Sequence, residues 1–308
     1  MAISPALRAV ACGAVALLAS AGAAAALDTV AVSDGVWALV GDTGQRSPEN
    51  LGNNATFGVI VTPEGVVLID PGGSREGAAA LDAAIGRITE KPVKIVVDTG
   101  GQDHRWLGNG YWKAKGARIV ASTAAVADQH ARGGMQIDAL RDFLGDHLAG
   151  TEPVFADTTF GTETTLRLGG VDLVLGAVAP AHTPGDLFVW LPDRKVVFAG
   201  DIVFVDRLLG VGPQSNSAGW VTAFEAMAAL APAHVVPGHG RPTTLAGAKA
   251  ATLDYLVALR RRIRELLDRG GGLAEAPKVD QSAFAGLAQF DALAARNASQ
   301  VYTEMEME

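Results

Sequence analysis

Alternating apolar and polar positions mark the strands that this chain predicts. Residues 29–41 (TVAVSDGVWALVG) alternate on both sides of a turn at Ser33–Gly35, which predicts a β-hairpin. Three further hairpins share the pattern and carry Gly or Pro at the turn: residues 55–73, 164–178 and 186–201. Short apolar runs predict additional strands, with at least one covered face, at residues 93–99, 117–122 and 234–240.

Apolar residues spaced three or four apart predict the helices. These are residues 75–90, 106–116, 123–148, 217–230, 244–268 and 281–305. We expect Gly133–Gly134 to break the third segment into two helices, and Ser217 to cap the fourth. Because each half of the chain runs from hairpins into helices, we expect an α/β fold, a four-layer α/β/β/α sandwich. No low-complexity linker interrupts residues 27–308, which predicts a single domain with a C-terminal helical extension from about residue 270.

The first 26 residues predict a secretory signal peptide. Arg8 gives a positive start, residues 9–19 are apolar, and Ala24–Ala26 offers small residues for cleavage near Ala26. A retained membrane anchor is the weaker alternative, because the apolar residues are mostly small. The only cysteine, Cys12, lies in this segment, so the mature chain has no disulfide and no thiolate nucleophile. We therefore expect an exported protein, periplasmic if its source is a Gram-negative bacterium.

The charge balance argues against a nucleic-acid partner. The formal net charge is −8, and the one basic run, residues 260–264, lies in a predicted helix and is typical of a solvated face. We expect a small-molecule substrate and no membrane contact after cleavage; the oligomeric state is left open.

Four side chains that suit metal binding follow predicted strands. His104, His182 and His239 each lie beside Gly, Asp or Pro, and Asp201 ends a strand of its own. Loops at strand ends are where a rigid sheet presents functional side chains. Four such positions together predict a shared site. The remaining histidines, in predicted helices or at the start of a strand, are expected to be structural: His130, His147 and His234.

The stretches HTPGDLFVWLPDRKVVFAGD (182–201) and VVPGHG (235–240) resemble the second-half motifs of the metallo-β-lactamase superfamily. GVIVTPEGVVLIDPGG (58–73) resembles its early hairpin, and the likeness covers roughly residues 29–268. The predicted export signal and C-terminal helix also resemble the exported SoxH-like, quinoprotein-relay zinc metallohydrolase branch. The resemblance implies the four-layer sandwich and a two-metal site. There His182 matches a ligand of the first metal, Asp201 the bridging carboxylate and His239 a ligand of the second.

The first metal motif departs from the family pattern Thr-His-x-His-x-Asp-His. Thr99 matches, but Gly100 and Gln102 stand where the two leading His belong. Without a gap, His104 falls on the Asp position and Arg105 on the final His. With one residue missing before Asp103 and one added later, Asp103 and His104 keep the Asp-His roles. We favour the gapped alignment because it restores the pair in its proper order.

These substitutions predict that the three-His site is lost, since only His182 is left of it. The second site keeps Asp103, His104, Asp201 and His239, enough for one zinc ion, although iron or manganese would tolerate the same donors.

The roles that follow are also expectations. Asp103 and Asp201 are the candidate ligands and proton acceptors, and Asp70 and Gln102 are expected to support the metal ligands. The function this implies is a mononuclear hydrolase that uses metal-activated water on an ester, thioester, lactone or amide. The alternative is a catalytically degenerate binding or accessory protein of the same fold.

Overall fold

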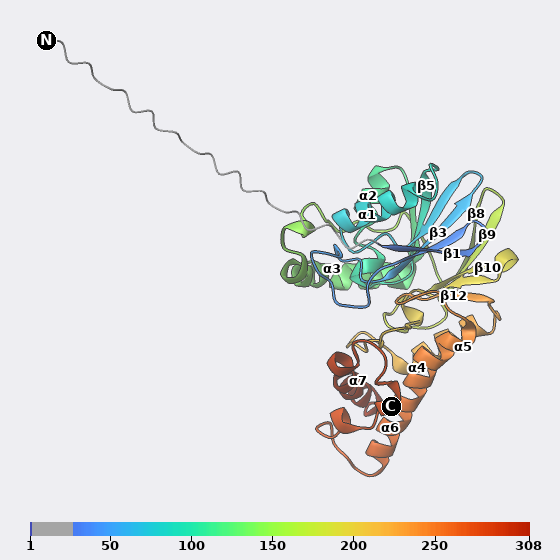
Figure 1. Ribbon diagram of the computed structural model, residues 1–308. Coiled ribbons are helices and arrows are strands. Elements are labelled where there is room, and N and C mark those ends of the chain that lie inside the picture. Colours follow the sequence, from blue (N-terminus) through green and yellow to red (C-terminus); the bar gives the residue numbers. More distant parts are fainter. Residues whose placement is uncertain (2–26) are drawn as a thin grey trace.

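The structure, a computed structural model, describes residue 1 and residues 27–308, so the predicted signal peptide lies outside the described residues. Two β-sheets pack against each other, with helices α1 (Arg75–Gly86) and α2 (Asn109–Ala114) near one sheet and α4 (Ser217–Ala228) to α7 (Phe290–Met305) near the other (Figure 1). This arrangement confirms the predicted α/β fold, a four-layer α/β/β/α sandwich.

The first sheet has seven strands in sequence order. The first four pair antiparallel and the last three continue in parallel from β4. The strands are β1 (Asp28–Ser33), β2 (Val36–Val40), β3 (Thr56–Thr62), β4 (Gly65–Ile69), β5 (Val93–Asp98), β6 (Arg118–Ser122) and β7 (Thr158–Phe160). The predicted hairpins at 29–41 and 55–73 are therefore confirmed.

The second sheet has five strands in the order β12-β11-β10-β9-β8. They are β8 (Glu163–Leu168), β9 (Val171–Gly176), β10 (Phe188–Leu191), β11 (Val196–Phe198) and β12 (His234–Val236). The two predicted hairpins of this half are present as β8–β9 and β10–β11. β12 joins β11 in parallel, with Val235 opposite Val197. The C-terminal ends of β11 and β12 therefore lie at the same edge of the sheet.

Two predictions about the helices were wrong: the break at Gly133–Gly134 and the N-terminal cap at Ser217. The remaining helices are α3 (Thr123–Leu144), α5 (Leu245–Ala248) and α6 (Asp254–Asp268), the last two joined by a π-helical turn over Lys249–Leu253. α3 does not break at Gly133, because that glycine is where the helix passes close to the Trp106 ring. The cap of α4 is Asn216 rather than Ser217; its side chain accepts from Gly219 N at 2.6 Å. α7 also begins later than expected, after a 3₁₀ turn over Ser282–Phe284.

Three apolar layers hold the sandwich together. Between the sheets, Val97 and Val120 pack with Phe198 and other buried residues. α1 buries Leu81 against the outer face of the first sheet. On the far side, Trp220 of α4 packs with the buried faces of α6 and α7. Removing this much apolar surface from water is the main favourable term for folding.

A buried amide on α7 helps to tie the C-terminal helices to the rest of the chain. Asn297 of α7 donates to Leu209 O at 2.8 Å and accepts from Val211 N at 2.8 Å. It also donates to the Tyr255 hydroxyl of α6 at 2.9 Å. α7 therefore fixes the loop that follows β11. Within the described part of the chain, no helix combines the length and apolar character that crossing a membrane requires.

Candidate metal site

The structure brings His104, Asp201 and His239 together in one buried group. Each offers a ligand atom, and the three atoms lie within 4.8 Å of one another. His104 Nε2 is 3.3 Å from Asp201 Oδ2, and His239 Nε2 is 3.2 Å from Asp201 Oδ1. The residues come from three separate strand ends, as the sequence predicts, and together they present two imidazoles and one carboxylate.

Short loops after β5, β11 and β12 carry these side chains. His104 lies in the 3₁₀ turn η1 (Asp103–Arg105) and Asp201 in η4 (Gly200–Ile202). Gly200 has φ +49°, and a Cβ there would overlap Thr99 Oγ1. A Cβ on Gly238 would overlap Gly200 O. Glycine at these two positions therefore lets the Asp201 and His239 loops approach each other and the β5 loop.

Arg105 is a buried cation beneath the group. Its Nη2 donates to Asp201 Oδ1 at 2.7 Å and to Gly238 O at 2.8 Å, and its Nη1 donates to Asp70 Oδ2 at 2.7 Å. Burial alone would raise the pKa of Asp201, but Arg105 and then His104 hold it well below the usual range. Burial likewise opposes the charge on Arg105, while Asp201 and Asp70 raise its pKa above the ordinary value. Both groups are ionised at neutral pH.

Asp70 supports this arrangement from the end of β4. Its Oδ1 accepts from both the Thr99 backbone N and the Thr99 hydroxyl at 2.8 Å. Its backbone has φ +67°, a left-handed conformation that costs a non-glycine residue about 1–2 kcal/mol. Burial raises the pKa of Asp70, and the nearby Arg105 guanidinium opposes that rise. In the structure, this Asp positions the β5 loop and Arg105 rather than a histidine.

Asp103 lies outside the three-residue group. Arg46 donates to it through Nε at 2.8 Å and also through Nη2, and His104 N donates to its Oδ1 at 2.8 Å. Burial alone would raise the pKa of Asp103, but Arg46 and His104 hold it below the ordinary range. A ligand role for Asp103 stays a prediction, and the structure shows its carboxylate engaged elsewhere.

The Nδ1 atom of His104 lies near one hydrogen-bond acceptor and one donor. It lies 3.0 Å from Asp103 Oδ1 and 3.0 Å from Arg46 Nη2. If Nε2 is to hold a metal, the ring proton belongs on Nδ1, where only Asp103 can accept it. A carboxylate behind a metal-binding imidazole fixes its orientation and raises its basicity. The geometry thus suits Asp103 as the residue that orients His104.

His182 lines the same cavity but is not part of the close group. Its Nδ1 lies 3.0 Å from Gly210 O, and since a carbonyl only accepts, Nδ1 carries the proton. Burial lowers the pKa of His182 to about 4. The ring is therefore neutral and keeps an unprotonated Nε2. Burial also lowers the pKa of His239 well below its usual value.

The first half of the metal motif is closed by other side chains. A Cβ on Gly100 would overlap Asp186 Oδ1, and one on Gly101 would overlap Asp128 Oδ2. Gln102 lines the cavity, and its Nε2 lies 3.3 Å from Asp103 Oδ1. Burial, and then the charge of Asp201, raise the pKa of Asp186 to about 8. A histidine at Gly100 would therefore require the buried Asp186 carboxylate, which accepts from Thr183 N at 2.8 Å, to move.

A cavity of about 160 Å³ opens onto the site. Its lining includes the three histidines and three arginines: His104, His182, His239, Arg46, Arg207 and Arg296. The arginines were missed at the sequence level, because they come from distant segments with no motif. Arg105 was considered only as an occupant of the final motif position.

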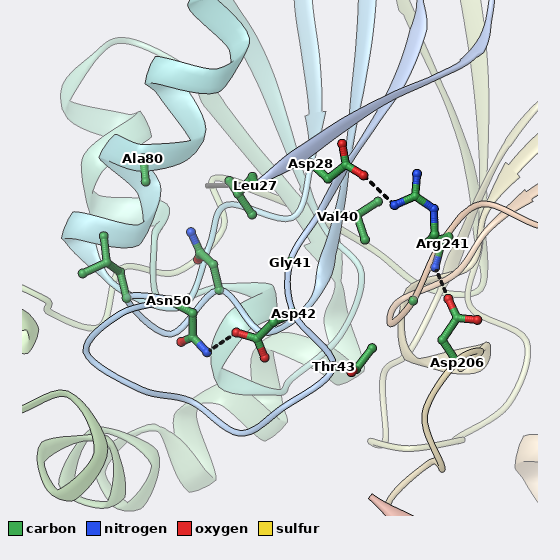
Figure 2. Close-up of a pocket in the computed structure, with 13 residues that line it drawn as sticks. Leu27, Asp28, Val40, Gly41, Asp42, Thr43, Asn50, Ala80, Asp206 and Arg241 are labelled. Carbon is green, nitrogen blue, oxygen red and sulfur yellow. Dashed lines mark hydrogen bonds and ion pairs between the residues drawn. The ribbon is translucent and has the colours of Figure 1, made fainter. Parts of the chain in front are cut away.

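A separate hollow of about 430 Å³ contains none of the candidate site residues. It lies beside the 41–55 loop, where Asn50 donates to Asp42 and Arg241 bonds both Asp28 and Asp206 (Figure 2). Its polar groups are largely paired with one another, so it gives no sign of a ligand.

The fold and the strand-end histidines define a family. The family model of the metallo-β-lactamase superfamily matches residues 51–239, more than half of the chain, and the protein belongs to this superfamily. Its members are mostly metallohydrolases. The narrower resemblance to the SoxH-like branch is not specifically supported and stays a prediction.

Solved structures with the same fold include a metallo-β-lactamase from Pontibacter korlensis. It is 23% identical, with a TM-score of 0.59, over 75% of this chain and 99% of that one. The metallo-β-lactamase FIM-1 from Pseudomonas aeruginosa, in its mono-zinc form, is 19% identical over 75% and 96%, with a TM-score of 0.59. The inverting sec-alkylsulfatase Pisa1 from Pseudomonas sp. is 16% identical, with a TM-score of 0.71, over 90% of this chain and 50% of that chain.

The residues present fit one divalent metal ion. Two buried atoms that face each other in the group have no hydrogen-bond partner among the described residues: His104 Nε2 and Asp201 Oδ2. Buried polar atoms normally have partners, so such a concentration of exceptions calls for a ligand. Two histidines and a carboxylate are donors that zinc accepts in catalytic sites, and iron accepts the same set.

Proposed function

We propose that this protein is an exported metal-dependent hydrolase with one divalent metal, held by His104, Asp201 and His239. Its substrate is an ester, thioester, lactone or amide. The observation that carries the proposal is the three-residue group itself: its ligand atoms lie within 4.8 Å of one another, two of its buried polar atoms lack a hydrogen-bond partner within residues 27–308, and both histidines line a cavity. A metal there would polarise the substrate carbonyl and supply a water of lowered pKa.

The side chains around the group take separate roles. Asp201, whose pKa is depressed by Arg105, acts as an anionic ligand and is a weak proton acceptor. Asp103 positions the His104 ring through Nδ1. His182 is neutral in the cavity, and its unprotonated Nε2 can bind the substrate or accept a proton. Gln102 donates toward Asp103 and presents an amide to the cavity.

The two oxygens of Asp201 support a single metal. A bridging carboxylate would give one oxygen to each of two ions. Here Oδ1 accepts from Arg105 at 2.7 Å, while Oδ2 lies 3.3 Å from His104 Nε2 and accepts no hydrogen bond from the described residues. The guanidinium thus supplies positive charge on the side where a second dication would share the carboxylate. Closure of the Gly100 position by Asp186 acts in the same direction.

Metal analysis tests the proposal. The mature protein is stripped with a chelator, reloaded with zinc, iron or manganese, and measured by elemental analysis. We expect about one ion per chain, lost in His104→Ala and Asp201→Asn. His234→Ala, an exposed histidine on β12, is the matched control and should keep the ion.

The other outcomes are equally informative. Two ions per chain would contradict the mononuclear site. No ion above background would favour the alternative, a binding or accessory protein of the same fold. Export is tested by the N-terminal sequence of the protein recovered from the periplasm: cleavage near Ala26 is expected, and an intact N-terminus would contradict it.

A further inference from the structure

Arg207 is a buried cation that forms no ion pair with any carboxylate of residues 27–308. Its side chain lies on the loop after β11, and the residue is only 6% exposed. Within the described residues its guanidinium makes one hydrogen bond, from Nη1 to Gly44 O at 3.0 Å, and no ion pair. Its Nε is buried without a partner in the same part of the chain. Burying a charge in this way is costly unless something pairs with it.

The surroundings make that burial less favourable still. Burial, and then the positive charge of Arg46, lower the pKa of Arg207 to about 10. It is still a cation at neutral pH, next to another cation. Arg46 is itself paired with Asp103, so its charge is partly balanced. Asp201 and Asp42 offset part of this effect, but neither forms an ion pair with Arg207 within the described residues.

The cavity that Arg207 lines is the one that contains the candidate metal ligands. Arg296 of α7 lines it too; it is exposed and forms no ion pair with any described residue. The described lining holds three arginines and no Asp or Glu. A cleft lined by one sign of charge concentrates ions of the opposite sign. A planar guanidinium also matches the two oxygens of a carboxylate, sulfate or phosphate.

We propose that the substrate carries an oxyanion group, which Arg207 binds together with Arg296 while the scissile bond faces His104 and His239. This inference rests on the proposed hydrolase function and names its substrate class: small anionic esters, thioesters, lactones or amides. The cavity of about 160 Å³ is below the usual range for drug-sized ligands, which limits the buried part of the substrate.

The C-terminal extension supplies part of this anion site. The family model ends at residue 239, and Arg296 lies beyond it on α7. Asn297, the next residue, fixes the backbone at Leu209 and Val211, close in sequence to Arg207. Leu208 N also donates to Ala288 O at 2.8 Å. The selection of anionic substrates therefore depends on α7 as well as on the sandwich.

Inorganic sulfate is the probe for a binding test. Titration calorimetry is run on the whole mature chain, metal-free and metal-loaded, at an ionic strength held constant with sodium chloride. We expect sulfate to bind both forms, about tenfold more weakly in Arg207→Met and about threefold more weakly in Arg296→Met. Arg118→Met, an exposed arginine on β6 outside the cavity, should bind like wild type.

The second variant keeps the test valid if the first one misfolds. If Arg207→Met fails to give the wild-type circular dichroism spectrum, the exposed Arg296 decides the question, and an unchanged affinity in Arg296→Met overturns the proposal. The proposal is also overturned if the wild type does not bind sulfate, or if both variants bind it as tightly as the wild type.

Hydrolysis of two esters of equal size, one anionic and one neutral, separates this inference from the proposed function. In Arg207→Met the KM for the anionic ester should rise about tenfold with kcat little changed, and the neutral ester should be unaffected. If the protein binds no metal and hydrolyses neither ester, yet sulfate binding still depends on Arg207, the hydrolase proposal fails and the anion site stands. If both esters are hydrolysed and Arg207→Met changes neither KM, only the anion site fails.

Discussion

Arg105 Nη2 lies 2.7 Å from Asp201 Oδ1, fully buried beneath the candidate metal ligands. The same guanidinium binds Asp70 from the first half of the chain, so one side chain joins the motifs of both halves. In the superfamily pattern, the position that Arg105 takes in the ungapped alignment belongs to a metal-binding histidine. Here it balances the carboxylate with a permanent charge. The site is therefore held in shape before any metal arrives.

Removing that charge should destabilise the protein strongly. Arg105→Met would leave Asp70 and Asp201 buried without their cation, and breaking a buried pair in this way costs about 3–5 kcal/mol. Urea unfolding of the metal-free protein, followed by tryptophan fluorescence, measures the loss. Arg118→Met, on the exposed end of β6, should change stability by no more than about 0.5 kcal/mol. A loss in Arg105→Met as small as this control would show that the pair contributes little.

Asp103→Asn distinguishes an orienting residue from a ligand. If Asp103 holds His104 by Nδ1, the amide should weaken metal binding about 10- to 100-fold without abolishing it. Competition with a chromogenic chelator gives the affinity, and Asp172→Asn serves as the control, because Asp172 of β9 is partly exposed and pairs with Arg167. Loss as complete as in His104→Ala would instead support direct ligation, as the gapped alignment predicts.

The sequence predicted those parts of the molecule that depend on local pattern. Alternation located the hairpins, and strand-end position singled out His104, Asp201 and His239, which the structure brings together. The motif register was beyond such reasoning, since Asp103 and His104 are adjacent and only the tertiary contacts of Arg46 show where each points.

The cavity arginines were hidden for a related reason. Arg46 comes from the loop before β3, Arg207 from the loop after β11, and Arg296 from α7. No local spacing connects these three segments, and they meet only once the layers have packed. At Gly133 the sequence predicted a helix break that the structure does not contain, because this glycine allows close contact with Trp106.

Asp186 should make the protein less stable as pH rises. Its folded pKa of about 8 is above the unfolded value near 4, so folding favours the protonated carboxyl. That contribution is complete below the unfolded pKa and is lost as pH rises toward 8. Asp186→Asn keeps an acceptor for Thr183 N and never ionises. The variant should gain stability over wild type between pH 5 and pH 8, measured as the difference in urea midpoints at equal metal content. A constant difference across this range would contradict the raised pKa.

Introducing histidines at Gly100 and Gln102 should not create a second metal site. A Cβ at Gly100 would overlap Asp186 Oδ1, so even Gly100→Ala should cost about 1–3 kcal/mol through overpacking. Gln102 lines the open cavity, and Gln102→His should be tolerated with a loss below about 1 kcal/mol. We therefore expect Gly100→His/Gln102→His to be destabilised and still to bind no more than one zinc ion by elemental analysis. Urea unfolding of the two single variants separates the steric effect from the change in ligands. A stable double variant with two zinc ions would show that the first site can reopen, and that Asp186 does not close it.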